Sequence, residues 1–522
     1  MRKISVLLAV AIAAAACDPP IRWDDALPDH ASDSDLHGMI VLGDKLEDPF
    51  TVENMTRAFA SVYPTKASRI VMTPTDYYVR FLPSGEEQYE RLESMGVSMI
   101  DHPVDYEILK DGDWYHDPEV EDGRITWQYA VVDSGFKFPE DIRHEILDEC
   151  YIAENDLSTK TDGLDWEAVE REAFRLTGNG DMLDQTRAGT ASGTPEGRIE
   201  IEDSFFGGQT EGVRGVKVSC NSFVKFAHAY TDKEGNYRMS KSFSSKVRYR
   251  IVYKNAKGFA IGVNLIIVPA STSSLGSGDP AGKSVRIDAD SERKLYTRSA
   301  VNNAAYDYYE KCKGQDGTIK TPPANLRIWI FQHLESSSAP MLQQGAFVDN
   351  SFITEYLGEG ASILKMFLPD LTIGLKHIEE YKEIYSTTLH ELSHASHFMQ
   401  VGTGYWTNYI NFILRSFITS GFVTYGVGTE KNSGYCEVGE MWSYFNESLM
   451  IRERYDNDYV SGTSYWFYPQ IFLYMEERGI DRYKIFAALT SDINSRDVLQ
   501  KKLVSLYPEE KSMINQAFAK YQ

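Results

Sequence analysis

Cysteine is scarce in this sequence, with five residues in 522. Apart from the one at position 17, the cysteines are widely spaced, and none belongs to a Cys-x-x-Cys pair. Four such cysteines do not make a disulfide framework, although they leave room for one disulfide. The missing Cys-x-x-Cys spacing also argues against a structural zinc site built on cysteine.

The sequence also has fewer basic than acidic residues and few long apolar runs. Lys and Arg number 53 against 76 Asp and Glu, which gives a net charge of −23 and a pI of about 5.0. This charge disfavours binding to DNA, RNA or anionic lipid, so we expect no nucleic-acid partner. After the first 16 residues, no apolar run reaches the roughly 18 residues of a transmembrane helix. The 42% hydrophobic content is ample for large cores, and the length predicts three or four domains.

The first 34 residues are typical of an exported chain. A basic start, residues 1–3, precedes an apolar run at 4–16 that is too short for a stable span and ends in small residues before Cys17. This pattern resembles a bacterial lipoprotein signal, which implies a diacylglycerol on Cys17 and a membrane anchor. Residues 18–34 are acidic and contain proline, as a tether would. An ordinary signal peptide with an incidental Cys17 is the alternative.

The pentapeptide at 390–394 reads His-Glu-Leu-Ser-His, an HExxH motif. On a helix, His390 and His394 lie on one face and can direct two imidazoles at one zinc ion. Glu391 is then placed to act as the general base toward the attacking water. No Gly or Pro interrupts residues 381–388, and Gly402 follows the motif, so we expect it to lie within a helix.

A later segment, residues 435–449, offers the carboxylate that would complete a three-ligand site. Its apolar residues recur at helical spacing, and Glu437 and Glu440 share the adjacent polar face. Position 400 is Gln, which excludes the metzincin pattern with its third His. His397 lies close to the metal face, and the sequence leaves open whether it supports the metal site or is simply packed.

HExxH followed by a glutamate helix resembles the gluzincin family of zinc metallopeptidases. The run from Glu440 to Tyr444 fits the family better than Glu437 does, so the resemblance implies Glu440 as the third ligand, with Glu437 as the alternative. Tyr444 stands where thermolysin-like members place an Asp that orients a zinc histidine. The chain also lacks the Gly-Ala-Met-Glu-Asn run of the clan's aminopeptidases. Tyr465 and Tyr468 are candidate oxyanion stabilisers.

The catalytic region of such a protein needs a sheet beside the motif helix. Residues 299–313 are typical of a helix, 326–331 of a strand, and 368–374 of an edge strand because of Pro369. Metallopeptidases of this clan bind extended peptide along such an edge, so we expect a peptide or protein substrate. The resemblance covers roughly residues 290–455 and implies a zincin-like domain at 280–522.

Two further domains are predicted before this one. Residues 35–187 form an N-terminal α/β region, with a β-α-β unit near 76–109 and helices at 140–151 and 166–177. Residues 188–195 are typical of a linker. Short strands then fill 196–275, where Thr231-Asp-Lys-Glu-Gly-Asn-Tyr237 resembles the turn of carboxypeptidase regulatory-like β-sandwich domains.

Together these patterns predict a multidomain α+β protein with a lipoprotein signal (1–17), a tether (18–34) and three domains. It resembles the multidomain metallopeptidase lipoproteins of Bacteroides-like bacteria. We expect an exported zinc metallopeptidase, anchored by lipid to the bacterial cell envelope, most plausibly the outer membrane, and facing the periplasm or the cell surface. Two alternatives remain open: a surface binding lipoprotein with a degenerate zincin domain, and a zinc hydrolase of a non-peptide amide.

Overall fold

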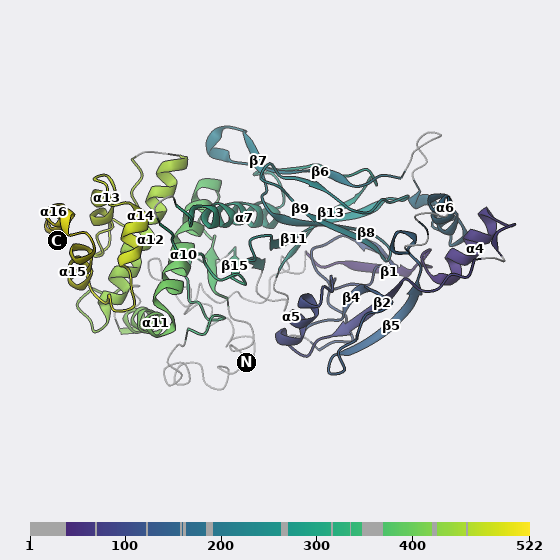
Figure 1. Ribbon diagram of the computed structural model, residues 1–522, viewed down its shortest axis with the longest axis horizontal. Coiled ribbons are helices and arrows are strands. Elements are labelled where there is room, and N and C mark those ends of the chain that lie inside the picture. Colours follow the sequence, from purple (N-terminus) through teal and green to yellow (C-terminus); the bar gives the residue numbers. More distant parts are fainter. Residues whose placement is uncertain are drawn as a thin grey trace.

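The computed structural model describes residues 38–521 except 68–69, 122–123, 157–158, 160–162, 184–191, 263–269, 315–316, 333, 335, 347–368, 420–424 and 456–457. The described chain is an α+β protein with several sheets, elongated in Figure 1 from an N-terminal sheet region to a C-terminal group of helices. Cys17, the tether and the first half of the predicted linker lie outside the described residues. No described helix is long and apolar enough to cross a membrane.

The N-terminal region contains two small antiparallel sheets, β1–β3 and β4–β2–β5. The strand, helix and strand predicted near 76–109 are present as β2, α5 and β3, but they do not form a β-α-β unit, because β2 and β3 belong to different sheets. The helix predicted at 140–151 is also wrong, since Arg143–Cys150 pairs along β2 as a strand, and this pairing outweighs the helix-favouring Glu and Asp residues. The elements are β1 (Val41–Lys45), α4 (Val52–Val62), β2 (Asp76–Leu82), α5 (Glu86–Ser94), β3 (Tyr106–Lys110), β4 (Gln128–Asp133), β5 (Arg143–Cys150), η2 (Ala153–Asn155), α6 (Trp166–Leu176) and η4 (Gly180–Met182).

Two sheets then fill the middle of the molecule. One has the order β10-β6-β14, with β7 also on β6, and the other runs β16-β15-β12-β11-β8-β9, with β13 on β11. The elements are β6 (Glu196–Glu202), η5 (Ser204–Phe206), β7 (Thr210–Gly212), β8 (Val216–Ser222), β9 (Lys225–Tyr230), β10 (Asn236–Arg238), β11 (Val247–Asn255), β12 (Ala260–Gly262), β13 (Thr272–Gly278), β14 (Val285–Ile287), β15 (Arg327–Phe331) and β16 (Leu371–Gly374).

The second sheet crosses the predicted domain boundary near residue 280. Ile261 of β12 pairs in parallel with Ile328 of β15, and Ile330 pairs in parallel with Ile373 of β16. One cluster of buried apolar side chains extends from Ile199 in β6 to the last helix. The strands before residue 280 and the helices after it therefore share a sheet and a core.

The edge strand predicted at 368–374 is present as β16, but its outer side is not open. β16 is the last strand of its sheet, but the chain itself covers its outer side. Ser338 exchanges two backbone hydrogen bonds with Thr372, and the Met341 amide donates to the Asp370 carbonyl. Residues 336–341 therefore form the outermost extended segment, next to the motif helix.

Helices cover the C-terminal end of the molecule (Figure 1). α10 lies between α7 and α12 and contacts both along its length. Trp442 Nε1 donates to the Ser393 carbonyl at 3.0 Å, and Tyr308 donates to Ser396 at 2.9 Å, which fixes α12 and α7 against α10. The elements are α7 (Arg293–Lys311), α10 (Tyr381–Val401), α11 (Thr403–Thr419), α12 (Ser433–Arg454), α13 (Gln470–Glu476), α14 (Arg482–Ala488), α15 (Arg496–Leu506), η7 (Pro508–Glu510) and α16 (Lys511–Lys520).

Candidate metal centre

α10 and α12 bring three predicted ligand residues together. His390 and His394 project from α10, as the HExxH spacing predicts, and Glu440 faces them from α12. The two Nε2 atoms are 3.2 Å apart. Glu440 Oε2 is 3.4 Å from His390 Nε2, and Glu440 Oε1 is 3.5 Å from His394 Nε2.

These distances fit a tetrahedral metal. Two ligand atoms each about 2.05 Å from one ion, at the tetrahedral angle, stand roughly 3.3 Å apart. All three separations lie close to that value, and the donors are the two imidazoles and one carboxylate that catalytic zinc sites use. The residues present therefore fit a zinc ion in ligand type, number and spacing.

Burial and mutual charge define the electrostatics of this cluster. Glu440 is fully buried; burial raises its pKa, but the charges and hydrogen bonds of His394 and His390 outweigh burial and bring the pKa to about 2. Burial lowers the pKa of His390, yet the hydrogen bonds that its ring donates to Glu440 and Glu447 raise that pKa well above its ordinary value. The pKa of His394 is lowered, mainly by burial. The carboxylate is thus held as an anion among groups that favour a cation.

Glu447, two turns after Glu440 on α12, fixes the orientation of His390. Its Oε2 lies 3.1 Å from His390 Nδ1. Its Oε1 accepts hydrogen bonds from Ser386 at 2.6 Å and Tyr459 at 2.9 Å. A carboxylate on Nδ1 keeps the proton there and directs the Nε2 lone pair at the metal position. Glu447, rather than Tyr444, is therefore the α12 side chain that holds His390 Nδ1.

Glu440 has its own partner from α11. The Tyr409 hydroxyl donates to Glu440 Oε1 at 2.6 Å, and its ring lies 5.6 Å from the His394 ring. The approach depends on Gly439, because a Cβ at that position would stand 3.3 Å from a ring carbon of Tyr409. Glu391, the predicted general base, is 1% exposed in the same helix turn as His390.

The alternative ligand Glu437 lies elsewhere. Its carboxylate pairs with Arg496 Nε of α15 at 3.3 Å and does not belong to the group of converging ligand atoms. His397 is fully buried against the rings of Tyr405 and Trp406, and burial lowers its pKa to about 3. No polar atom of the described chain bonds its ring nitrogens. This environment favours packing over a role in supporting the metal site.

The two predicted oxyanion tyrosines are not placed alike. Tyr465 stacks on Tyr444 with ring centroids 5.9 Å apart, and Tyr444 in turn lies 4.4 Å from the His390 ring. Tyr468 lies over the guanidinium of Arg496, on the Glu437 side. The structure thus brings Tyr465 to the rim of the cluster, one ring away, and places Tyr468 outside it.

Sequence reasoning missed Glu447, Tyr409 and Tyr459 as members of the site. Glu447 carried a signal, because it shares the polar helical face of Glu440. Tyr409 and Tyr459 carried no sequence signal that separates them from the other tyrosines among the 32 in the chain. Tyr409 lies on α11 and Tyr459 follows α12, and both reach the site only through tertiary packing. In comparisons with known proteins, no family model, no curated protein and no solved structure matches this chain.

Proposed function

We propose that this protein is a zinc-dependent peptidase of the gluzincin kind, with a zincin-like catalytic domain. The observation that carries the proposal is the convergence of His390, His394 and Glu440 at tetrahedral spacing, in the helix that also holds Glu391. Glu440, rather than Glu437, is the proposed third ligand, because Glu437 pairs with Arg496.

Zinc held by these residues would polarise the scissile carbonyl and lower the pKa of the attacking water. Glu391 takes the proton of that water on its carboxylate and passes it to the leaving amine. Its burial supports this role, since a carboxylate removed from bulk water is a stronger base. Glu447 retains the proton on His390 Nδ1 throughout, and Tyr409 keeps Glu440 in one rotamer.

Residues 336–341 are the proposed wall for an extended peptide. They run beside α10: Ser337 Oγ is 3.5 Å from Thr387 Oγ1, and the Ala339 carbonyl accepts from Trp406 Nε1 at 2.9 Å. Trp406 packs against His394. Ser338 pairs its backbone with Thr372 of β16, and we propose that an extended substrate adds along the side of the segment away from this pair.

We also propose that the chain is exported and anchored by lipid on Cys17 to the bacterial cell envelope, as its N-terminal pattern indicates. Mass spectrometry of the mature N-terminus tests this independently of the zinc chemistry. We expect a diacylated Cys17 as the first residue. An unmodified terminus starting elsewhere contradicts the anchor.

The test of the enzymatic proposal combines metal analysis with a peptide-library digest. The purified protein should contain one zinc per chain and cleave peptides. Glu391→Gln should keep zinc and lose cleavage by about 10²- to 10⁴-fold or more, the size of a general-base contribution. Glu383→Gln, an exposed position on the same helix, is the matched control and should be as active as the wild type.

Each rival has its own outcome in this experiment. Zinc without cleavage of any peptide, but with hydrolysis of small amides that depends on Glu391, identifies a non-peptide amide hydrolase. Absence of both zinc and hydrolysis, with the fold intact, identifies a binding protein with a degenerate zincin domain. Full activity of Glu391→Gln overturns the proposed base.

A further inference from the structure

Five side chains form a surface beside the metal helix, which we call the lysine platform: Phe205, Phe206, Lys382, Tyr455 and Tyr459. The Lys382 ammonium lies 4.7 Å from the Phe205 ring centroid, 5.5 Å from that of Tyr455 and 5.7 Å from that of Tyr459. Phe205 and Phe206 are 47% and 38% exposed, unusual for large apolar side chains. The platform is therefore apolar, open to solvent and centred on one cation.

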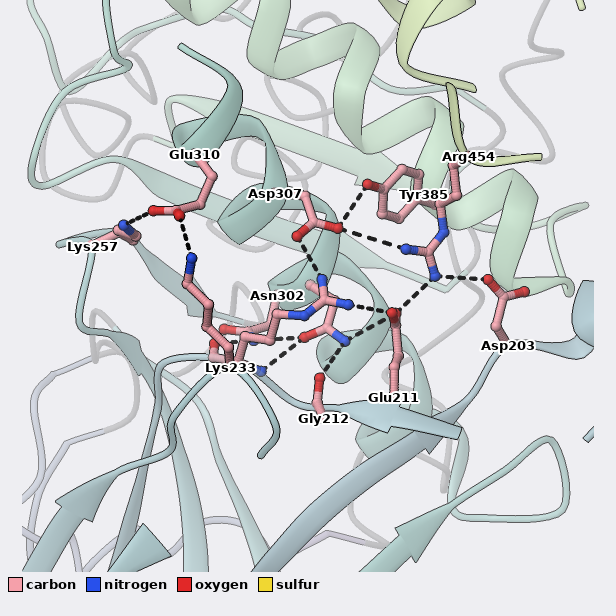
Figure 2. Close-up of polar contacts among 12 residues, drawn as sticks. Asp203, Glu211, Gly212, Lys233, Lys257, Asn302, Asp307, Glu310, Tyr385 and Arg454 are labelled. Carbon is pink, nitrogen blue, oxygen red and sulfur yellow. Dashed lines mark hydrogen bonds and ion pairs between the residues drawn. The ribbon is translucent and has the colours of Figure 1, made fainter. Parts of the chain in front are cut away.

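The platform is firmly built, because Asp203 anchors the turn that carries its two phenylalanines. Asp203 is 3% exposed at its side chain and accepts from Arg454 Nη2 at 2.9 Å and from the Tyr455 hydroxyl at 2.8 Å. Figure 2 shows this contact, in which Arg454 at the end of α12 reaches Asp203 and Glu211. Phe206 then stacks on Tyr455 at 5.4 Å. The turn is thus held rigidly against α10 and α12.

Lys382 differs from the other cations of this region in the partners that the described residues give it. Arg454 and Arg214 are paired with carboxylates, whereas no Asp or Glu of the described chain forms an ion pair with Lys382. Ring faces attract an ammonium but accept no strong hydrogen bond, so its donors remain available to a ligand. Beside apolar rings a carboxylate partner would be bound more strongly than in open water.

The platform also lies close to the metal cluster. Tyr459, one of its rings, donates to Glu447, and Glu447 contacts His390. Lys382 precedes His390 by eight residues of α10, a helical rise of about 12 Å. An extended peptide covers about 3.3 Å per residue, so three to four residues of substrate span that distance.

We propose that Lys382, on its aromatic platform, is a specificity subsite that binds a carboxylate of the substrate three to four residues from the cleaved bond. This inference rests on the proposed peptidase function. The carboxylate can belong to an Asp or Glu side chain or to a peptide C-terminus. Phe205 and Phe206 supply apolar contact to the residues on either side of it.

The experiment uses matched fluorogenic peptides in which one Glu or one Gln occupies each position up to four residues from the cleaved bond. The full-length wild type should prefer Glu at one of these positions by roughly tenfold in kcat/KM, the size of one charged hydrogen bond. Lys382→Met should abolish that preference through KM, leaving kcat for the Gln peptide unchanged. Peptides ending at the same position, as free acids or amides, distinguish a terminal carboxylate from a side chain.

Lys484→Met is the control, because Lys484 is another half-buried helical lysine that forms no ion pair among the described residues. It should retain the wild-type preference. A Glu preference unchanged in Lys382→Met, or no acidic preference in the wild type, overturns the subsite while leaving the peptidase standing. If no peptide is cleaved, the proposed function fails. Binding of the same Glu and Gln peptides to zinc-loaded Glu391→Gln, with and without Lys382→Met, then decides on the subsite alone.

Discussion

The antiparallel pair α10 and α12 is joined by two groups of carboxylates. At the start of α10 and the end of α12 lies the arginine cluster, in which Asp203, Glu211 and Asp307 pair with Arg454 (Figure 2) and Arg214 pairs with Glu211 and Asp307. In the middle of both helices, Glu440 and Glu447 face His390 and His394. Both groups join the same helices, but the positive charge comes from different sources.

In the arginine cluster the chain supplies its own cations. Arg454 bonds Asp203 and Glu211 at 2.9 Å each, and Arg214 bonds Asp307 at 2.5 Å. Burial raises the pKa of Glu211, but Arg214 and Arg454 outweigh burial and lower that pKa below its ordinary value. These arginines favour the ionised form of Glu211, and the cluster connects the β7 region to both helices.

The metal cluster relies on histidine instead, because contacts with Glu440 and Glu447 raise the pKa of His390. No Lys or Arg of the described chain pairs with Glu440 or Glu447, and the two imidazoles turn their Nε2 atoms toward each other at 3.2 Å. A metal cation between them would take both lone pairs, as we propose. The comparison therefore contrasts a cluster in which arginines pair with the carboxylates with one that we propose holds a metal ion.

The largest effect should follow from removing a ligand. His390→Ala should lose stoichiometric zinc, because a three-ligand site reduced to two loses most of its affinity. The wild type should gain about 4 kcal/mol of stability at zinc concentrations a thousandfold above the dissociation constant, and the variant none. Elemental analysis and melting curves with zinc or chelator measure this. An unchanged zinc content in His390→Ala would show that His390 is not a ligand, and the contrast between the two clusters would then fail.

Removing the internal cation should act differently. Arg454→Met leaves Asp203 and Glu211 without their shared partner and should destabilise the fold by about 3–5 kcal/mol, equally with zinc and with chelator. Urea denaturation measures the loss. Arg478→Met, at an exposed pair with Glu477, is the control and should cost less than about 1 kcal/mol. A loss seen only with zinc would show that the two clusters are one unit.

The two clusters also differ in how far the sequence predicts them. The metal cluster rests on local patterns: the spacing of His390 and His394 places both on one helical face, and periodicity places Glu440 on the polar face of a second helix. The arginine cluster joins residues from position 203 to position 454, and no local pattern connects them. Pairings set by tertiary packing alone leave no periodic signal.

The same contrast holds for the fold. Strand β2 and helix α10 follow alternation and helical spacing and begin at the predicted residues. Arg143–Cys150, with its charged residues, was predicted as a helix and becomes a strand only because β2 offers it a partner. The parallel pairing of β12 with β15 spans more than sixty residues of sequence and was likewise not predictable.

Three glutamates of α12, Glu440, Glu447 and Glu437, should differ in their effect on zinc affinity when each is replaced by Gln. Glu440→Gln should weaken zinc most, because a neutral amide replaces an anionic ligand. Glu447→Gln should cost about 10- to 100-fold, as expected of a residue that orients a ligand. Glu437→Gln should leave zinc affinity unchanged and lose only its contact with Arg496. A larger loss in Glu437→Gln than in Glu440→Gln would move the ligand to Glu437.

The smallest effect should appear in how the free energy of unfolding changes at acid pH. Urea denaturation measures it, with chelator present so that zinc contributes nothing. Because the pKa of Glu211 is lowered in the fold from an ordinary value of 4.5, its ion pairs stabilise the protein fully above that pH. This stability is lost as the pH falls through the lower folded pKa. Glu211→Gln should therefore be less stable than the wild type at pH 7, by on the order of 1 kcal/mol for each unit of the lowering, and the two should converge below pH 4.5. A difference that persists unchanged into strong acid would show that Glu211 acts through packing rather than through its charge, and would weaken the contrast between the arginine and metal clusters.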